Sequence, residues 1–211
     1  MTEKNKQQQS PKISSSSTTE RILDAAEQLF AEKSYEGTRL REIAARVGIR
    51  EPSIYSHFTN KAAIYDAVID RALSPFYQEI NQWNRSDLTL RDINEIPRKL
   101  MELHGAHPYS AQLLHREFCQ PLERINPKVI QWWNEIMVQS HQFMDGLPEN
   151  EHKHIDRNKV IANAVALTNI TLGVFSTQGI QTKLLADDYC KSTLFEEHVK
   201  VISKIFKSLV L

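Results

Sequence analysis

The chain has 211 residues, of which 41% are hydrophobic, and its 26 Lys and Arg residues balance 26 Asp and Glu residues. This length and composition suit one large or two small globular domains and exclude a chain that is disordered throughout. Zero net charge excludes a protein that coats nucleic acid by bulk attraction, so any DNA contact must be local.

The sequence has neither an evident membrane-targeting segment nor cysteines at a redox spacing. No apolar run approaches the length of a membrane span, and the first residues lack the apolar segment of a secretory signal, so we expect a cytoplasmic protein with no membrane partner. The two cysteines, Cys119 and Cys190, are far apart and match no metal-ligand or redox spacing. Both are expected to be reduced thiols.

The first part of the chain predicts a tail and then a helix. Residues 1–16 are rich in Gln, Ser and Lys and almost free of apolar residues, so we expect a disordered tail. Its lysines leave open a role as an arm that contacts DNA. Ser17 and Glu20 have the spacing of a capping box, which predicts a helix start. The apolar residues that follow at helical spacing form its buried stripe: Ile22, Ala26, Leu29 and Phe30.

Residues 38–61 predict a helix-turn-helix. Apolar residues at helical spacing give the first half one buried face, and Thr38 is a candidate N-cap for it. Gly48 permits the left-handed backbone of a tight turn. Pro52 suits the first turn of the second helix, which we expect over residues 50–58. Spacing alone leaves open an ordinary pair of helices joined by a glycine turn.

The identities of these residues add a second signal. It is carried by Gly37-Thr38, Arg41-Glu42-Ile43-Ala44, Val47-Gly48-Ile49, Ser53-Ile54-Tyr55, His57-Phe58 and Asn60-Lys61, with Glu20 to Ala26 and Leu29-Phe30 before them. Over residues 18–72 the chain closely resembles the DNA-binding domain of the TetR family of transcriptional regulators. The resemblance implies an all-α fold, with a three-helix DNA-binding domain at 17–72 and a helical effector-binding and dimerisation domain at 73–211.

The start of the second helix holds the candidate base readers. A recognition helix enters the major groove with its N-terminal residues nearest the base edges. The candidates are Arg50, Glu51, Pro52, Ser53 and Ser56. Arg50 can offer two parallel donors to a guanine, although a phosphate contact or simple solvation is an equal alternative. The chain departs from the commonest family pattern at Arg39, Arg50 and Glu51, so the operator sequence does not carry over.

The resemblance also implies a set of phosphate contacts, which position the protein without reading sequence. These residues are Thr38, Arg39, Tyr55, His57 and Lys61. Local charge agrees, because residues 38–61 hold five cations against two acids.

The remainder of the chain predicts further helices. The first begins at Asn60-Lys61 and is interrupted or kinked at Ser74-Pro75, before a polar loop at 81–87. Later candidates are 88–103, complicated by Pro97, then 109–118, 127–144 ended by Gly146, 156–177, and a last helix that starts at a Thr193/Glu196 capping box.

Two features point to assembly as a homodimer. The 156–177 helix is rich in small residues that allow close approach of a second helix, and the last helix carries an apolar stripe. The resemblance implies that two such helices from each protomer form the interface. The candidate interface residues are Ala162, Ala166, Gly173, Phe195, Val199, Ile202 and Phe206.

A binding cavity between the later helices is expected, because effector sites are mostly apolar with a few placed polar groups. Its candidate walls are Trp83, His104, Phe118, Trp132, His141 and Phe175. His104, His107, His115, His152 and His154 lack partners at metal-ligand spacing, so we expect neither a metal nor another cofactor.

The resulting prediction is a repressor that binds a palindromic operator in double-stranded DNA as a dimer and is released by a small-molecule effector. Two alternatives stay open. One is a ligand-independent DNA-binding regulator controlled by a protein partner, and the other is a metal-dependent enzyme built on the histidines. No nucleophile with its base and no phosphate-binding loop is evident, so we expect no enzymatic activity.

Overall fold

The computed structural model describes residues 17–83, 90–145, 157–177, 179, 183 and 191–210. These residues form helices and no β-strand, which confirms the predicted all-α class. In chain order the elements are α1 (Thr18–Gly37), α2 (Leu40–Val47), the 3-10 helix η1 (Glu51–Ser56), α3 (Lys61–Trp83), α4 (Leu90–Ala106), α5 (Pro108–Phe118), the 3-10 turn η2 (Leu122–Arg124), α6 (Pro127–Asp145), α8 (Arg157–Ser176) and α10 (Lys191–Val210). None of the described helices is long and apolar enough to cross a membrane.

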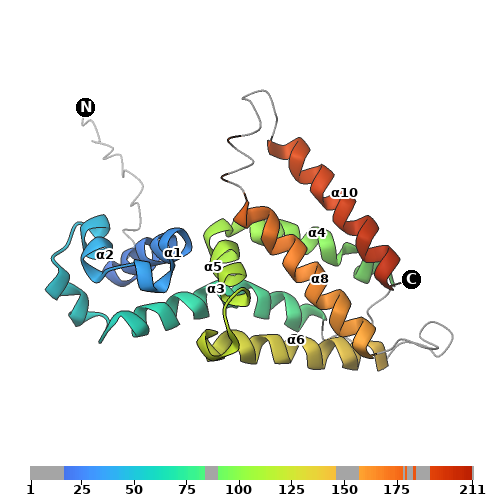
Figure 1. Cartoon of the computed structure of the whole chain (residues 1–211), viewed down its shortest axis with the longest axis horizontal. Coiled ribbons are helices and arrows are strands. Elements are labelled where there is room, and N and C mark those ends of the chain that lie inside the picture. The colour runs from blue at the N-terminus through green and yellow to red at the C-terminus, as the bar shows by residue number, and fades with distance from the viewer. Residues whose placement is uncertain are drawn as a thin grey trace, which may run out of the picture.

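The helices form a small head and a larger body (Figure 1). In the head, α1, α2 and η1 pack with the first half of α3 around an apolar core. Its largest members have no exposed surface: Ile22, Phe30, Ile43, Ile54 and Ile64. Burial of this stripe holds the head together.

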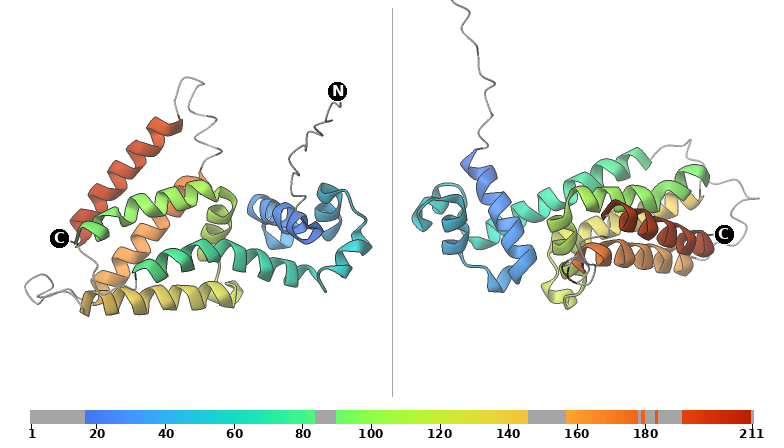
Figure 2. Two further views of the ribbon diagram at one scale, coloured as in Figure 1. Left: turned by 180° about the vertical axis from the view of Figure 1, so that it is seen from behind. Right: turned by 90° about the horizontal axis from the view of Figure 1, so that it is seen from above.

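The second half of α3 lies in the body, so one helix crosses the boundary predicted at residues 72–73. There α3 packs against α5 and α6, and α8 packs against α4, α5 and α6. The C-terminal helix α10 covers α4 and α8 on the side away from α6 (Figures 1 and 2). The body is therefore built around the end of the same helix that completes the head.

The start of α1 confirms half of the predicted capping box. Ser17 is the N-cap, and its hydroxyl oxygen accepts a hydrogen bond from the backbone N–H of Glu20 at 3.2 Å. The carboxylate of Glu20 points instead toward Arg71 of α3, at 3.7 Å. A cationic partner on another helix has replaced the local capping bond.

The predicted cap of α2 is wrong. The N-cap is Arg39, whose backbone N–H donates to the carboxylate of Glu42 at 3.0 Å. Thr38 is buried, and its hydroxyl donates to the carbonyls of Leu29 at 3.1 Å and Ser34 at 2.8 Å. Ser34 has a positive φ of 70° that turns the chain at the end of α1, so Thr38 closes that turn from inside.

The turn after α2 forms as predicted. Gly48 adopts a left-handed backbone with φ of 76°, which L-residues with a Cβ rarely adopt. The segment that follows is shorter and tighter than expected, because η1 is a 3-10 helix that ends at Ser56 instead of Phe58. Its single buried side chain, Ile54, anchors it to the head.

Two prolines lie inside helices. Of the interruption or kink predicted at Ser74-Pro75, the interruption is wrong, since α3 continues through Pro75 to Trp83 and takes in the first residues of the predicted loop. Pro97 likewise lies within α4. Each proline removes one backbone donor, and burial along the rest of the helix outweighs that loss.

The predicted start of the last helix is also wrong. Helix α10 begins at Lys191, before Thr193, so Thr193 and Glu196 form no capping box. Both oxygens of Glu196 accept hydrogen bonds from the guanidinium of Arg98 on α4, at 3.0 and 2.8 Å. The 1–16 tail, Gly146, His152, His154 and Cys190 lie outside the described residues.

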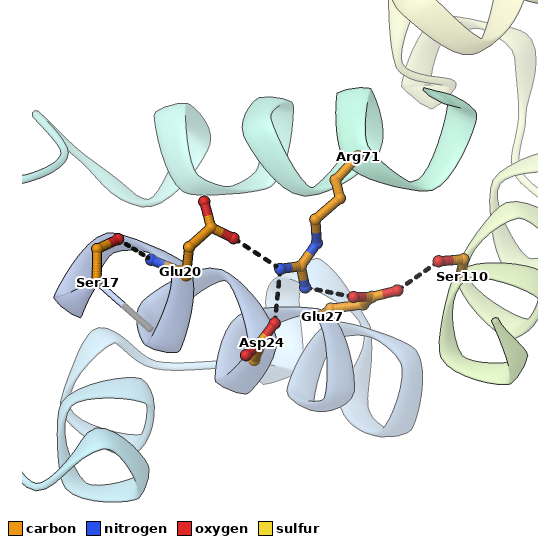
Figure 3. A network of polar contacts seen from close by, with 6 residues as sticks. All are labelled: Ser17, Glu20, Asp24, Glu27, Arg71 and Ser110. Atoms are coloured by element: carbon orange, nitrogen blue, oxygen red, sulfur yellow. Dashed lines mark hydrogen bonds and ion pairs between the residues drawn. The ribbon is translucent and has the colours of Figure 1, made fainter. Parts of the chain in front are cut away.

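Arg71 of α3 joins the head to the helix that leaves it. Its guanidinium lies 2.6 Å from Asp24 and 3.7 Å from Glu20, and it also pairs with Glu27, all on α1 (Figure 3). Ser110 of α5 donates its hydroxyl hydrogen to the other oxygen of Glu27. This network therefore links α1, α3 and α5, which belong to the head, the connection and the body.

A second joint lies around Tyr65, also on α3. Its ring packs edge-on against Phe30 and Tyr35, with both centroid distances 4.9 Å. Its hydroxyl donates to the buried carboxylate of Glu117 on α5, and burial together with this carboxylate raises the pKa of Tyr65. Glu117 also accepts from the backbone N–H of Asn126 at 2.7 Å, which fixes the start of α6 to the same joint.

Replacing Arg71 by Met should lower the free energy of unfolding by about 1–2 kcal/mol, because three neighbouring carboxylates lose their cation. The figure is modest because the Arg71 side chain is 29% exposed. Urea unfolding would measure it, with Lys200→Met as the control, since Lys200 pairs only within α10 on the surface. Equal unfolding midpoints for the two variants would contradict the role given to Arg71.

Candidate functional site

The five predicted base readers lie together at one exposed turn. Arg50 is the N-cap of η1, and Glu51, Pro52, Ser53 and Ser56 belong to it. All five are exposed, while the neighbouring Ile54 is fully buried. The turn thus presents its polar residues outward from a fixed apolar anchor, which is the arrangement that reading base edges requires.

Three of the predicted phosphate contacts are also exposed. Arg39 precedes α2, and the Tyr55 ring is 55% exposed on η1. His57 follows η1, and its Nδ1 lies 3.0 Å from the hydroxyl of Thr19 at the start of α1. This bond connects α1 to the end of the turn formed by Arg50 and η1, which we call the reading turn.

The other two predicted phosphate contacts have structural partners. Thr38 is 1% exposed, and its hydroxyl donates to the carbonyls of Leu29 and Ser34 within the head. The ammonium of Lys61 donates to the carbonyls of Tyr35 at 2.7 Å and Thr38 at 3.1 Å and lies 4.2 Å from the centre of the Tyr35 ring. One of its three N–H groups is left for another acceptor.

Several charges of the head are paired with each other. Lys33 binds Glu42 at 2.8 Å, and this hydrogen bond, with that from the Arg39 backbone, lowers the pKa of Glu42. Arg46 lies 3.6 Å from Glu32. Of the five cations counted in the sequence, Arg39, Arg41 and Arg50 are exposed and form no ion pair within the part of the chain that the structure describes, so the unpaired positive charge is smaller than the count suggested.

The predicted effector residues converge on Phe76, which the sequence reading did not single out. Its ring centroid lies 5.1 Å from that of His104 and 5.3 Å from that of Trp132. His104 also contacts Phe175 at 5.9 Å, and Trp132 contacts Phe118 at 6.1 Å. Four predicted residues from α4, α5, α6 and α8 therefore form one cluster with α3, which we call the aromatic core.

The other two predicted pocket residues, Trp83 and His141, lie in helices, but their side chains are outside the described part of the structure. The aromatic core is closely packed. A hollow of about 490 Å³ lies elsewhere, along the face of α6 lined by Ile130, Asn134 and Val138, and a second, smaller hollow lies between α8 and α10. No group of three or more potential metal ligands occurs among the described residues.

Three of the predicted dimer residues belong to the protomer's own core. Val199, Ile202 and Phe206 are 3%, 1% and 8% exposed. They lie on α10, which packs against α4 and α8, so their apolar stripe is already covered. Ala166, Gly173 and Phe195 are half-buried, and Ala162 is exposed.

Other apolar residues of the same two helices are exposed. On α8 these are Ile161 at 40% and Val165 at 39%, and on α10 Val201 at 55% and Ile205 at 37%. The sequence analysis did not name these four residues as dimer candidates, because it selected the strongest apolar stripe of each helix. The strongest stripe is the one that the protomer buries. Apolar residues outside that stripe were the sequence feature that could have indicated an exposed apolar surface.

Comparison with known proteins gives matches in sequence and in fold. Residues 22–68 match the family model of bacterial regulatory proteins of the tetR family. The biofilm operon icaADBC HTH-type negative transcriptional regulator IcaR of Staphylococcus epidermidis is 39% identical over 115 residues, which span 51% of this chain and 62% of that protein. Its namesake from Staphylococcus aureus strain Newman is 47% identical over 47 residues, or 22% of this chain and 25% of that one. The matches thus span less than two thirds of either relative.

Solved structures match over most of the chain. A TetR-like transcriptional regulator from Rhodococcus sp. RHA1 has a TM-score of 0.65 at 16% identity, covering 92% of this chain and 93% of that one. AibR, in complex with isovaleryl coenzyme A and operator DNA, has a TM-score of 0.67 at 14% identity, covering 90% and 97%. At these identities the likeness shows the fold alone. In sequence, α1, α2, η1 and the first turns of α3 match the tetR family of bacterial regulatory proteins, and in fold the chain matches a TetR-like structure along most of its length.

Proposed function

We propose that the protein is a cytoplasmic transcriptional repressor that binds a palindromic operator as a homodimer and releases it when a small molecule binds the body. The observation that carries the proposal is the exposed turn at η1, where Arg50 and Ser53 face outward from the buried anchor Ile54. A polar reading turn fixed on an apolar head suits the major groove.

Contacts at the edge of this turn would set the register on DNA. Arg39 and Tyr55 are exposed beside it, and Lys61 keeps one N–H group for a phosphate. Thr38 is left out of the proposed contacts, because its hydroxyl is used inside the head. Repression, as opposed to activation, is supported by the two similar proteins named as negative regulators.

The dimer interface is proposed on the exposed apolar surface of α8 and α10. Ile161, Val165, Val201 and Ile205 supply it in place of the buried stripe. A twofold axis through this surface would pair each helix with its copy, and such isologous pairs are the commonest oligomers. Two reading turns related by this axis would match the two halves of a palindrome.

Release by an effector is proposed to act through α3. This helix carries Phe76 in the aromatic core, and it carries Tyr65 and Arg71 at the two joints with the head. A ligand that separates the rings around Phe76 would shift α3, and α3 would carry the head with it. The ligand can act only if it binds the shifted arrangement more tightly than the DNA-bound one.

Two arginine variants test the DNA contacts. Arg50→Ala should weaken operator binding by about 1–3 kcal/mol and relax the preference at one base position. Arg39→Ala should weaken binding to operator and scrambled duplexes by the same factor and reduce the salt slope by about one, because it removes a phosphate contact. Fluorescence anisotropy on DNA flanking the protein's own gene, across a salt series, measures both effects.

The matched control is Arg124→Ala, which removes an exposed arginine of the body at η2. It should leave both duplexes unaffected. Equal losses for Arg50→Ala and Arg39→Ala on every sequence would refute the division between reading and positioning. Equal, weak binding of wild-type protein to both duplexes at physiological salt would count against the proposed function itself.

The dimer surface is tested by single charges. Val165→Asp and Val201→Asp should each convert the dimer to monomers, because each places an unpaired carboxylate in an apolar interface. Analytical ultracentrifugation gives the mass directly. Val138→Asp is the control, since Val138 is as exposed as Val201, at 55%, but lies on α6. A dimer that survives both interface substitutions would place the interface elsewhere.

A further inference from the structure

Buried polar atoms without hydrogen-bond partners occur in the aromatic core and on α3 one turn after Phe76. Oε2 of Glu79, Nδ1 of His104 and Nε1 of Trp132 are buried and have no hydrogen-bond partner among the residues that the structure describes. The rings of His104 and Trp132 both contact Phe76, and Glu79 lies one turn after Phe76 on the same side of α3. A fourth such atom, Nδ1 of His198, belongs to α10. Native proteins keep few such atoms, so a cluster of them requires an explanation.

The unpartnered atoms have complementary demands. The indole N–H of Trp132 only donates, and a carboxylate oxygen such as Oε2 of Glu79 accepts. Burial lowers the pKa of His104 to about 3, so its ring is neutral at physiological pH, with one donor and one acceptor nitrogen. A partner that satisfies both Trp132 and Glu79 must carry a hydrogen-bond acceptor and a donor.

The surroundings of these atoms are aromatic. His104 and Trp132 are each 2% exposed, and Phe175 is 7% exposed. Phe118 and Trp133 lie at the edge, with ring centroids 5.3 Å apart, and both are only half-buried. These two rings are free to move toward solvent more easily than the others. A flat ligand that enters between α5 and α6 would displace them and stack on Trp132.

We propose that the aromatic core binds a flat aromatic compound bearing a hydroxyl group, which stacks among Phe76, Trp132 and Phe175 and bonds to Trp132 and Glu79. A hydroxyl group is donor and acceptor at once, so it answers both demands with one substituent. The assignment rests on the proposed function, because it names the effector class of that same site. Without ligand, the aromatic rings pack together while the polar atoms of Trp132 and Glu79 lack hydrogen bonds. The bound ligand would separate some of the rings and supply those hydrogen bonds.

The test uses 2-naphthol as the probe, with naphthalene and 2-methoxynaphthalene as matched probes that lack the hydroxyl donor. Isothermal titration calorimetry with the full chain measures affinity, and thermal unfolding measures stability. Wild-type protein should bind 2-naphthol about tenfold more tightly than either matched probe, the effect of one hydrogen bond to a buried group.

Glu79→Met separates a binding role from a structural one. It should weaken 2-naphthol about tenfold and should raise the melting temperature of ligand-free protein, because a buried unpartnered oxygen is replaced by an apolar group of similar size. Glu135→Met is the control, since that carboxylate already accepts from Gln131 at 2.9 Å. Trp132→Phe should weaken 2-naphthol, and Trp133→Phe should not.

Lack of 2-naphthol binding, equal binding of the three probes, or unchanged affinity in Glu79→Met and Trp132→Phe would each overturn the assignment. DNA affinity, measured on the same wild-type protein, separates this failure from failure of the proposed function. If the protein binds its operator and 2-naphthol does not change the operator affinity, only the proposed effector class is refuted. Loss of 2-naphthol affinity in Glu79→Met with normal operator affinity supports the assignment.

Discussion

The contact between Arg71 and three carboxylates of α1 is the interaction on which the arrangement of the molecule depends. Glu20, Asp24 and Glu27 would repel one another without a cation, and the guanidinium can reach all three because they follow one face of the helix. Through Ser110, Glu27 extends this contact to α5. These polar side chains therefore reinforce the junction of head and body beside the apolar core that the two share.

One helix runs through both the head and the body, and this would explain how a signal in the body can reach the head. The first half of α3 buries Ile64 in the head, and the second half brings Phe76 to the aromatic core. Pro75 stands between the Arg71 joint and Phe76, yet the helix continues through it. A continuous helix transmits a rotation or shift along its whole length, so the aromatic core and the reading turn are proposed to be coupled by geometry instead of by a chain of small contacts.

Sequence reasoning was most accurate where a local rule decides. Helical spacing of apolar residues located the helices, Ser17 capped α1, and Gly48 made the left-handed turn. The capping predictions were wrong at Thr38 and Glu196, because each side chain forms its hydrogen bonds with a residue of another helix. The spacing of capping residues does not show which helix will lie beside them. Three predicted dimer residues, Val199, Ile202 and Phe206, are instead buried within the protomer, because periodicity identifies apolar residues but not which stripe the protomer itself covers. Four predicted pocket residues lie in one cluster even though the sequence did not give their positions in space. This is because large aromatic residues collect in the core of any helical body.

The central claim is that two copies of the head read two halves of one operator. Hydroxyl-radical footprinting of the DNA flanking the gene tests it most directly. The account predicts two protected segments related by a dyad, with centres about 34–36 Å apart or a multiple of that distance, because each reading turn occupies a successive major groove. A single protected segment without symmetry, or equal protection of a scrambled duplex, would contradict it.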